Sequence, residues 1–236
     1  DATVIPDDIL IIEEFNGDAI ADWRIGALGT PTVVVPSRTA FGVANFATGT
    51  TIGNDYGASI GGSTATATGL YNWSKTMKFE ARVKQNVLTG QRNVVGMFNT
   101  TVTIVFTQMQ SGCFFNYTSD PSGTSHWWAN CCIANTAAAP PVLCTSVNTT
   151  INANSSNFRT FTIEPRDMDK TGHVVFTVGY GVNDTVNDGG YRRLQVANIS
   201  TNVEKNYIAY IGFAGETTDT TADNMRVDYI YWNAKR

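Results

Sequence analysis

Aromatic rings that could stack on a sugar are the chemical groups in this sequence that most suggest a ligand. His126, Trp127 and Trp128 are consecutive, and Tyr191 follows Gly189-Gly190. An exposed ring packs against the apolar face of a pyranose. Neighbouring residues of a strand point to opposite faces, so one of Trp127 and Trp128 is expected in the core and the other at the surface. These four residues are the carbohydrate-binding candidates, although a core or interface role is the default for each ring.

Four cysteines within one short region could supply either thiols or disulfides. They are Cys113, Cys131, Cys132 and Cys144. The spacing contains no C-x-x-C, and His126 is the nearest imidazole, so zinc binding is not indicated. One interpretation is buried free thiols. The other is one or two cross-strand disulfides, because a turn at 120–123 would place Cys113 opposite Cys131 or its neighbour. A second turn, at 137–141, would bring Cys144 opposite the same pair. Disulfides would indicate an oxidising destination.

The carboxylates show no arrangement typical of catalysis or metal binding. Glu13 and Glu14 are the only adjacent glutamates, and on a strand they point to opposite faces. Glu80 could approach Asp228 or Glu164 in space, but a surface ion pair is the stronger interpretation. The segment 167–172 begins like a calcium loop, yet Val178 stands where a bidentate glutamate is required, so a hairpin turn is favoured. No metal and no cofactor are predicted.

Composition excludes several classes of function. The chain has 236 residues, of which 15% are charged and 42% hydrophobic, with a net charge of -4. A charged fraction this low means that Thr, Asn, Ser and Gly cover the surface. The acidic balance argues against nucleic-acid binding. No apolar run approaches the length of a membrane helix. The sequence therefore predicts neither a nucleic-acid nor a membrane partner.

The elements that must position these residues are strands. Helix patterns with caps are nearly absent, and many short alternating segments are separated by turn residues. The predicted strands are 9–15, 32–35, 40–46, 77–85, 93–99, 101–108, 112–118, 125–133, 142–151, 158–165, 173–180, 192–199, 208–214 and 225–232. Phe79, Ala81 and Val83 should face a core. The phase break in 158–163 permits a bulge, and 49–69 is expected to form a long loop or a weak strand pair.

The predicted organisation is one domain, 9–236, preceded by a short arm at 1–8. Strands near both termini indicate a sandwich in which the first and last strands meet. The predicted fold class is all-β: a two-sheet antiparallel β-sandwich of the jelly-roll kind. Asn-x-Ser/Thr sequons, the acceptor motif for N-glycosylation, begin at Asn72, Asn99, Asn116, Asn148, Asn154, Asn183 and Asn198.

The order of several segments resembles the concanavalin A-like lectin/glucanase superfamily, especially its versions in bacteriophage virion proteins. The segments that carry the resemblance are Phe15 with Trp23, 77–83, 94–99, 112–117 with 126–129, 158–164 with 174–178, and 227–231. The resemblance implies a concanavalin A-like jelly roll. Glycan-cleaving members commonly carry Glu-x-Asp-x-x-Glu on one strand, a motif that this sequence lacks.

By that resemblance, the chain is predicted to be a non-enzymatic virion structural protein, as a capsid decoration, fibre or tail-surface component. Its expected location is the virion surface. Its expected partners are other virion proteins and its own copies, in a homo-oligomer such as a trimer, with a cell-surface glycan as a further ligand. The alternative is a secreted carbohydrate-binding module or a diverged glycan-cleaving enzyme of the same fold.

Overall fold

A computed structural model gives the fold of the protein. It describes residues 8–13, 23–28, 43–60, 71–72, 76–85, 89–98, 112–119, 126–133, 143–152, 157–166, 172–180, 192–200, 208–222 and 224–235. The predicted arm, the predicted strands at 32–35 and 101–108, and the predicted turn at 120–123 lie largely or wholly outside these ranges. Across the described residues, no helix is long and apolar enough to cross a membrane.

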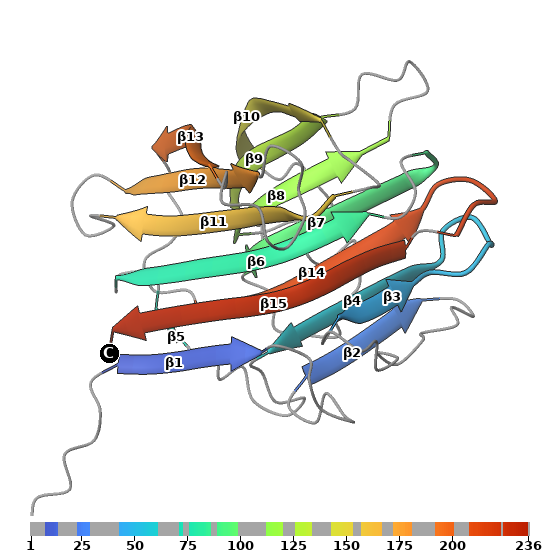
Figure 1. Ribbon diagram of the computed structural model, residues 1–236, viewed down its shortest axis with the longest axis horizontal. Helices are drawn as coiled ribbons and strands as arrows, with labels where there is room; N and C mark the ends of the chain where they lie inside the picture. Colours follow the sequence, from blue (N-terminus) through green and yellow to red (C-terminus); the bar gives the residue numbers. More distant parts are fainter. Residues whose placement is uncertain are drawn as a thin grey trace, which may run out of the picture.

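Two antiparallel sheets form the described part of the molecule (Figure 1). The seven-stranded sheet has the order β1 (Asp8–Glu13), β15 (Asn224–Lys235), β6 (Met77–Gln85), β11 (Arg159–Arg166), β12 (His173–Tyr180) and β13 (Arg192–Ser200), with β3 (Ala44–Ala47) also paired to β15. The eight-stranded sheet has the order β10 (Leu143–Asn152), β9 (His126–Ile133), β8 (Gly112–Thr118), β7 (Gln91–Phe98), β14 (Ile208–Thr217), β4 (Asp55–Ile60) and β2 (Trp23–Leu28), with β5 (Tyr71–Asn72) paired to β14.

The first and last strands meet, as the sequence predicted. β1 pairs with β15 from Asp8↔Lys235 to Glu13↔Ile230. Figure 1 shows both in the same layer, with β1 at its edge. The predicted all-β, two-sheet antiparallel sandwich is confirmed.

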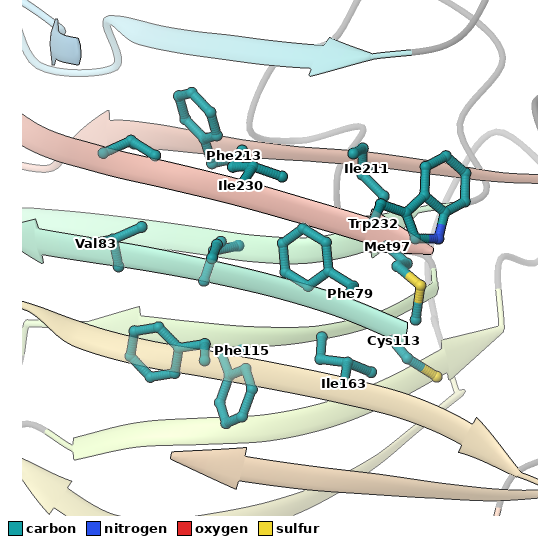
Figure 2. Close-up of a cluster of buried hydrophobic side chains, with 14 of the residues drawn as sticks. Phe79, Val83, Met97, Cys113, Phe115, Ile163, Ile211, Phe213, Ile230 and Trp232 are labelled. Carbon is teal, nitrogen blue, oxygen red and sulfur yellow. The ribbon is translucent and has the colours of Figure 1, made fainter. Parts of the chain in front are cut away.

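One hydrophobic core fills the space between the sheets. Phe79, Ala81 and Val83 of β6 are at most 1% exposed, so the predicted inward face of this strand is confirmed. Figure 2 shows Phe79, Phe115, Phe213 and Trp232 gathered between strands of both sheets. Period-two alternation in each strand puts these side chains on the inner face, and their burial is the main contribution to stability.

The expectation of a loop or weak strand pair at 49–69 is confirmed as a loop for 49–54 but was wrong for 55–60. Residues 55–60 form β4, which pairs with β14 on one side and β2 on the other. Tyr56 and Ala58 are fully buried. Propensity failed here because β4 packs small residues between two neighbouring strands, and tertiary contacts override composition in such strands.

The bulge expected in 158–163 is absent. β11 pairs in continuous register with β6 from Arg159↔Val83 to Ile163↔Phe79. The phase break has another cause, because Phe158 lies outside the strand and on its outer side, where Arg82 and Lys84 lie over its ring at 4.8 and 5.6 Å. Phe161 and Ile163 alone point into the core.

A bulge does occur in β15, between Val227 and Tyr229. Because of the extra residue, two successive side chains, Asp228 and Tyr229, both lie on the outer face of the seven-stranded sheet. Asp228 pairs with Arg82, and the Tyr229 hydroxyl donates to Glu80 at 2.7 Å. Glu80 also lies 3.1 Å from Lys78, so the predicted ion pairing of this glutamate is confirmed, but Glu80 is buried, at 7% exposed, and not at the surface.

Replacing Gly112 with alanine is expected to lower the free energy of unfolding by about 1–3 kcal/mol. Gly112 has φ of +124°, and an added Cβ would lie 2.2 Å from the Met97 carbonyl oxygen of the neighbouring strand. Urea unfolding measures the change. Gly53→Ala is the matched control, because Gly53 has φ of +82° and no atom within 4 Å of the added carbon. Equal losses in the two variants would contradict the steric explanation.

Candidate functional site

The candidate site lies on the outer face of the eight-stranded sheet, at the end formed by β8, β9 and β10. We call this surface the tryptophan face and define it by Asn116, Trp128, Asn130, Ser146 and Asn148. The strand register brings these residues together, because Asn116↔Trp128↔Asn148 form one row across the sheet. The next row continues through Asn130↔Ser146. Trp128 is 39% exposed, whereas Asn130 is 7% exposed.

A hydrogen-bonded row of polar side chains crosses these three strands. The Ser146 hydroxyl donates to Asn130 Oδ1 at 2.5 Å, and Asn130 Nδ2 donates to Asn116 Oδ1 at 2.6 Å. Asn130 Nδ2 also contacts the Trp128 carbonyl oxygen at 3.0 Å. These bonds fix the orientation of the Asn130 amide beside the exposed indole. A fixed amide next to an aromatic ring is a pre-organised set of contacts for a hydroxylated ligand.

The two disulfides connect the strands that carry this face. Cys113–Cys131 joins β8 to β9 on the core side, and Cys132–Cys144 joins β9 to β10 on the outer side. The sequence left thiols and disulfides open, and the structure pairs all four cysteines. Because Cys131 and Cys132 point to opposite faces, one strand serves two partners. Two disulfide bonds, in addition to the backbone hydrogen bonds, therefore hold β8, β9 and β10 in the register that forms the tryptophan face.

A small apolar cluster flanks the face on the same side of the sheet. Val94, Phe98, Phe114, Cys132 and Ala214 are at most 4% exposed although they point away from the main core. The Phe98 and Phe114 rings stack with centroids 5.4 Å apart. This cluster lies beside the polar row on the same face, since Val94 is opposite Asn116 and Phe114 is opposite Asn130. Between described strands β7 and β10, the register places no carboxylate on this outer face.

The structure gives different outcomes for the four carbohydrate-binding candidates. Trp128 is exposed and Trp127 is buried, so the prediction that one of the two rings is exposed is confirmed. Trp127 as a sugar contact is corrected: it is 1% exposed and packs on Phe161 at 4.6 Å, so its ring offers no face to a ligand. His126 is half-buried, two residues from Trp128 on the same strand. Tyr191 lies outside the described residues.

An irregular part of β10 forms the edge of the tryptophan face next to His126. The pairing with β9 shifts between Asn148 and Asn152, and Thr150 adopts φ of 60°. The Thr150 N–H donates to Asn148 Oδ1 at 2.8 Å, and the Thr149 hydroxyl donates to the Trp127 carbonyl at 2.6 Å. Asn148 is exposed and keeps its amide N–H groups available to a ligand beside Trp128.

Charge is concentrated on the opposite sheet. The outer face of the seven-stranded sheet carries the described pairs Lys78–Glu80, Arg82–Asp228 and Arg166–Glu164. Burial, and then the Arg226 guanidinium across the ladder, lower the pKa of Lys84. The tryptophan face has no charged residue among its five members. Its chemistry therefore suits an uncharged ligand that needs one stacking ring and several hydrogen-bonding amides.

The sequence missed Asn116, Asn130, Ser146 and Asn148. Alternation could have placed Asn130 on the same side as Trp128, since they are two residues apart. The residues of β8 and β10 join that face only through the register, which depends on turn lengths and on the disulfide partners. The pairing of β8, β9 and β10 could not be read from the sequence, so these four residues were not predicted to lie together.

Comparison with known proteins identifies the fold. No protein-family model matches the chain, and no curated protein matches its sequence. Among solved structures, a glycoside hydrolase family 16 endo-glucanase from Bacteroides ovatus has a TM-score of 0.56 at 14% identity, covering 93% of this chain and 98% of its own. The CBM2 module of the evolved Dit of Lactobacillus casei BL23 phage J-1 has a TM-score of 0.53 at 13% identity, covering 94% of each chain.

Peanut lectin is also similar, with a TM-score of 0.52 at 11% identity over 97% of each chain. Similarity at these identities shows the fold alone, since one fold hosts many functions. The chain has the concanavalin A-like jelly-roll fold that the sequence resemblance implied. The same fold carries an enzyme, a phage module and a lectin, so the choice among functions depends on this chain's own surface.

Proposed function

We propose that this protein is a secreted, non-catalytic carbohydrate-binding domain that holds an uncharged glycan on the tryptophan face. The observation that carries the proposal is the exposed indole of Trp128 beside the hydrogen-bonded Asn116–Asn130–Ser146 row. The indole stacks on the apolar face of a pyranose, while the Asn116 amide N–H groups donate to its hydroxyl groups and the Ser146 oxygen accepts from them. Asn130, whose amide groups are bonded within the protein, holds Asn116 and Ser146 in place. Asn148, directly across the ladder from Trp128, adds a further donor.

Two further features support this proposal. Disulfides persist in oxidising compartments and are rare in cytosolic proteins, and all four cysteines are paired. The solved structures of the same fold include carbohydrate-binding proteins by their names, among them peanut lectin and a phage CBM2 module. The first feature supports secretion, and the second supports a carbohydrate as the class of ligand.

Trp128→Ala is expected to weaken glycan binding at least about tenfold, a loss of about 1.4 kcal/mol. The test is a glycan array followed by titration calorimetry with the best ligand. Ile52→Ala is the matched control, because Ile52 is 65% exposed and belongs to the connection between β3 and β4, not to β8, β9 or β10. An array with no bound glycan, or unchanged affinity in the tryptophan variant, would refute the proposal. Production in a bacterial periplasm keeps the disulfides and leaves the Asn116 and Asn148 sequons bare.

The alternative of a glycan-cleaving enzyme has one specific candidate pair. Register places Glu216 of β14 opposite Asp55 of β4 on the outer side of the eight-stranded sheet. Two carboxylates close together could hydrolyse a glycosidic bond. However, Asp55 is 2% exposed, so a substrate does not reach its carboxylate. Glu216 is 3.5 Å from Arg92, so its carboxylate is already paired with a cation.

We therefore expect no release of reducing sugar from laminarin, mixed-linkage glucan or cellulose. A reducing-sugar assay over long incubation measures this. Glu216→Gln serves as the specificity control, because it keeps the shape of the side chain and removes its charge. Hydrolysis by the wild type that disappears in Glu216→Gln would establish an enzyme and end the non-catalytic proposal.

A virion-surface role is the second candidate, favoured by the similarity to the phage CBM2 module. In that role the same sandwich would bind other virion proteins or its own copies, for example as a trimer. Disulfides persist on virion surfaces as well as in secreted proteins, so the two bonds are compatible with this role. Immunogold labelling of native particles with an antibody to this chain tests the role, and light scattering of the purified chain tests the homo-oligomer. Labelled particles would favour this role over secretion.

A further inference from the structure

A pocket opens on the seven-stranded sheet, where β6 begins and β11 ends, on the opposite sheet from the tryptophan face. It has a volume of about 350 Å³ and is lined by Thr76, Lys78, Glu164, Arg166, Tyr231 and Asn233, among others. We call it the fork pocket. Its volume falls within the range of small-molecule sites, roughly 300–1,000 Å³. The size suits one sugar ring.

The pocket exists because two neighbouring strands stop pairing. The β6–β11 ladder ends at Phe79↔Ile163, but β6 begins earlier, at Met77, and β11 continues to Arg166. Each strand keeps its other neighbour there, since β6 pairs with β15 and β11 pairs with β12. Pro165 has no N–H to donate, and prolines within sheets stand where a ladder bond is absent. Pro165 therefore explains why the β6–β11 ladder does not continue beyond Ile163.

Side chains around the fork are oriented by bonds to one another. Lys78 Nζ lies 3.1 Å from Glu80 and 5.4 Å from the centre of the Tyr231 ring. Asn233 Nδ2 donates to the Tyr231 hydroxyl oxygen at 3.3 Å, so the Tyr231 proton is left to donate elsewhere. Arg166 Nη2 is 2.5 Å from Glu164 Oε2. The pocket thus presents donors and acceptors side by side.

Each cation that lines the pocket is paired with a carboxylate, and the four charges sum to zero when Glu80, which lies next to the lining, is included. Two cations, Lys78 and Arg166, are each bonded to a glutamate, Glu80 and Glu164. A site without net charge does not attract an anion strongly. A cation next to a carboxylate can bond a pair of adjacent hydroxyls, since each hydroxyl both donates and accepts. Because Lys78 covers the Tyr231 ring, hydrogen bonds rather than stacking would hold the ligand.

We propose that the fork pocket is a second saccharide site, which takes one uncharged pyranose unit through adjacent hydroxyl groups. The inference goes beyond the proposed function, and it stands on this pocket without requiring that the tryptophan face bind. A domain with sites on both sheets could cross-link two glycan chains or hold one polysaccharide at two points, which raises its avidity.

The test is a two-dimensional NMR titration of the ¹⁵N-labelled protein with methyl β-glucoside, methyl β-galactoside, methyl α-mannoside and glucuronate. The Asn233 side-chain amide reports on the fork pocket, and its signal is assigned by its loss in Asn233→Asp. The Trp128 indole reports separately on the tryptophan face. We expect at least one neutral glycoside to shift the Asn233 signal with a dissociation constant on the order of 1 mM.

Glu164→Gln is expected to weaken that binding about tenfold, because a hydrogen bond to a charged group is lost. Tyr231→Phe, which keeps the ring, provides a second variant. Arg226→Gln on β15 and Trp128→Ala are the controls, and both should leave the Asn233 response unchanged. The proposal is overturned if no neutral glycoside shifts the Asn233 signal, if Glu164→Gln leaves the dissociation constant unchanged, or if glucuronate alone binds.

Discussion

Trp127→Ala is expected to lower the free energy of unfolding by about 3–5 kcal/mol, the usual cost of deleting a buried aromatic side chain. The indole is 1% exposed and lies between the two sheets. Its ring centroid is 4.6 Å from Phe161 of the opposite sheet and 5.6 Å from Tyr117 of the neighbouring strand. Alanine would leave a cavity at a place where both sheets contribute contacts. Urea unfolding followed by circular dichroism measures the change.

Trp128→Ala is the adjacent control for this stability measurement. Trp128 is 39% exposed and points to the other side of the same strand. Its loss should change stability by no more than about 0.5 kcal/mol, while it abolishes most of the glycan affinity. Neighbouring residues would then show opposite phenotypes, one structural and one functional. A stable Trp127→Ala protein, or an unfolded Trp128→Ala protein, would show that the assignment of faces is wrong.

Removing the inner disulfide with the double change Cys113→Ala and Cys131→Ala is expected to cost about 3 kcal/mol of stability, given its loop of 18 residues. The bond restricts the unfolded chain and holds β8 against β9 beneath the tryptophan face. Because both sulfurs are buried, alanine introduces no unpaired polar group. Denaturation curves of the oxidised wild type and the double variant measure the difference.

A matched comparison removes the outer disulfide, Cys132–Cys144, which closes 12 residues. The loop model predicts a similar loss, again about 3 kcal/mol, because closure entropy depends only weakly on length. Mass spectrometry before and after alkylation checks that each variant keeps its remaining bond. If reducing agent left the unfolding midpoint of the wild type unchanged, the disulfides would have no part in stability.

Much of the architecture could be predicted from local patterns. The alternation in 77–83 assigned Phe79, Ala81 and Val83 to the core, and all three are buried. The terminal strands were expected to pair, and they do. The pattern failed at 55–60, where Gly, Ala and Ser between Tyr56 and Ile60 resemble a loop but form a strand with neighbours on both sides. Small residues carry little local signal, so only the neighbours decide their conformation.

The candidate site was predictable in only one of its members. Trp128 was expected to be exposed if Trp127 was buried, but alternation could not tell which of the two faces the core. The structure settles this, because Trp127 lies on the side that meets Phe161. Asn116 and Ser146 lie 12 and 18 positions from Trp128 in sequence, and they reach its face through the β8–β9–β10 register.

The amino-acid sequence by itself determined the strand class, the spacing of turns and the two alternating faces of each strand, because these depend on residues close together in the chain. Only the tertiary structure decided which cysteines pair, which tryptophan is exposed and where the β6–β11 ladder opens into the fork pocket. Those outcomes depend on how distant strands align, and a shift of one residue in that alignment would exchange the buried and exposed faces.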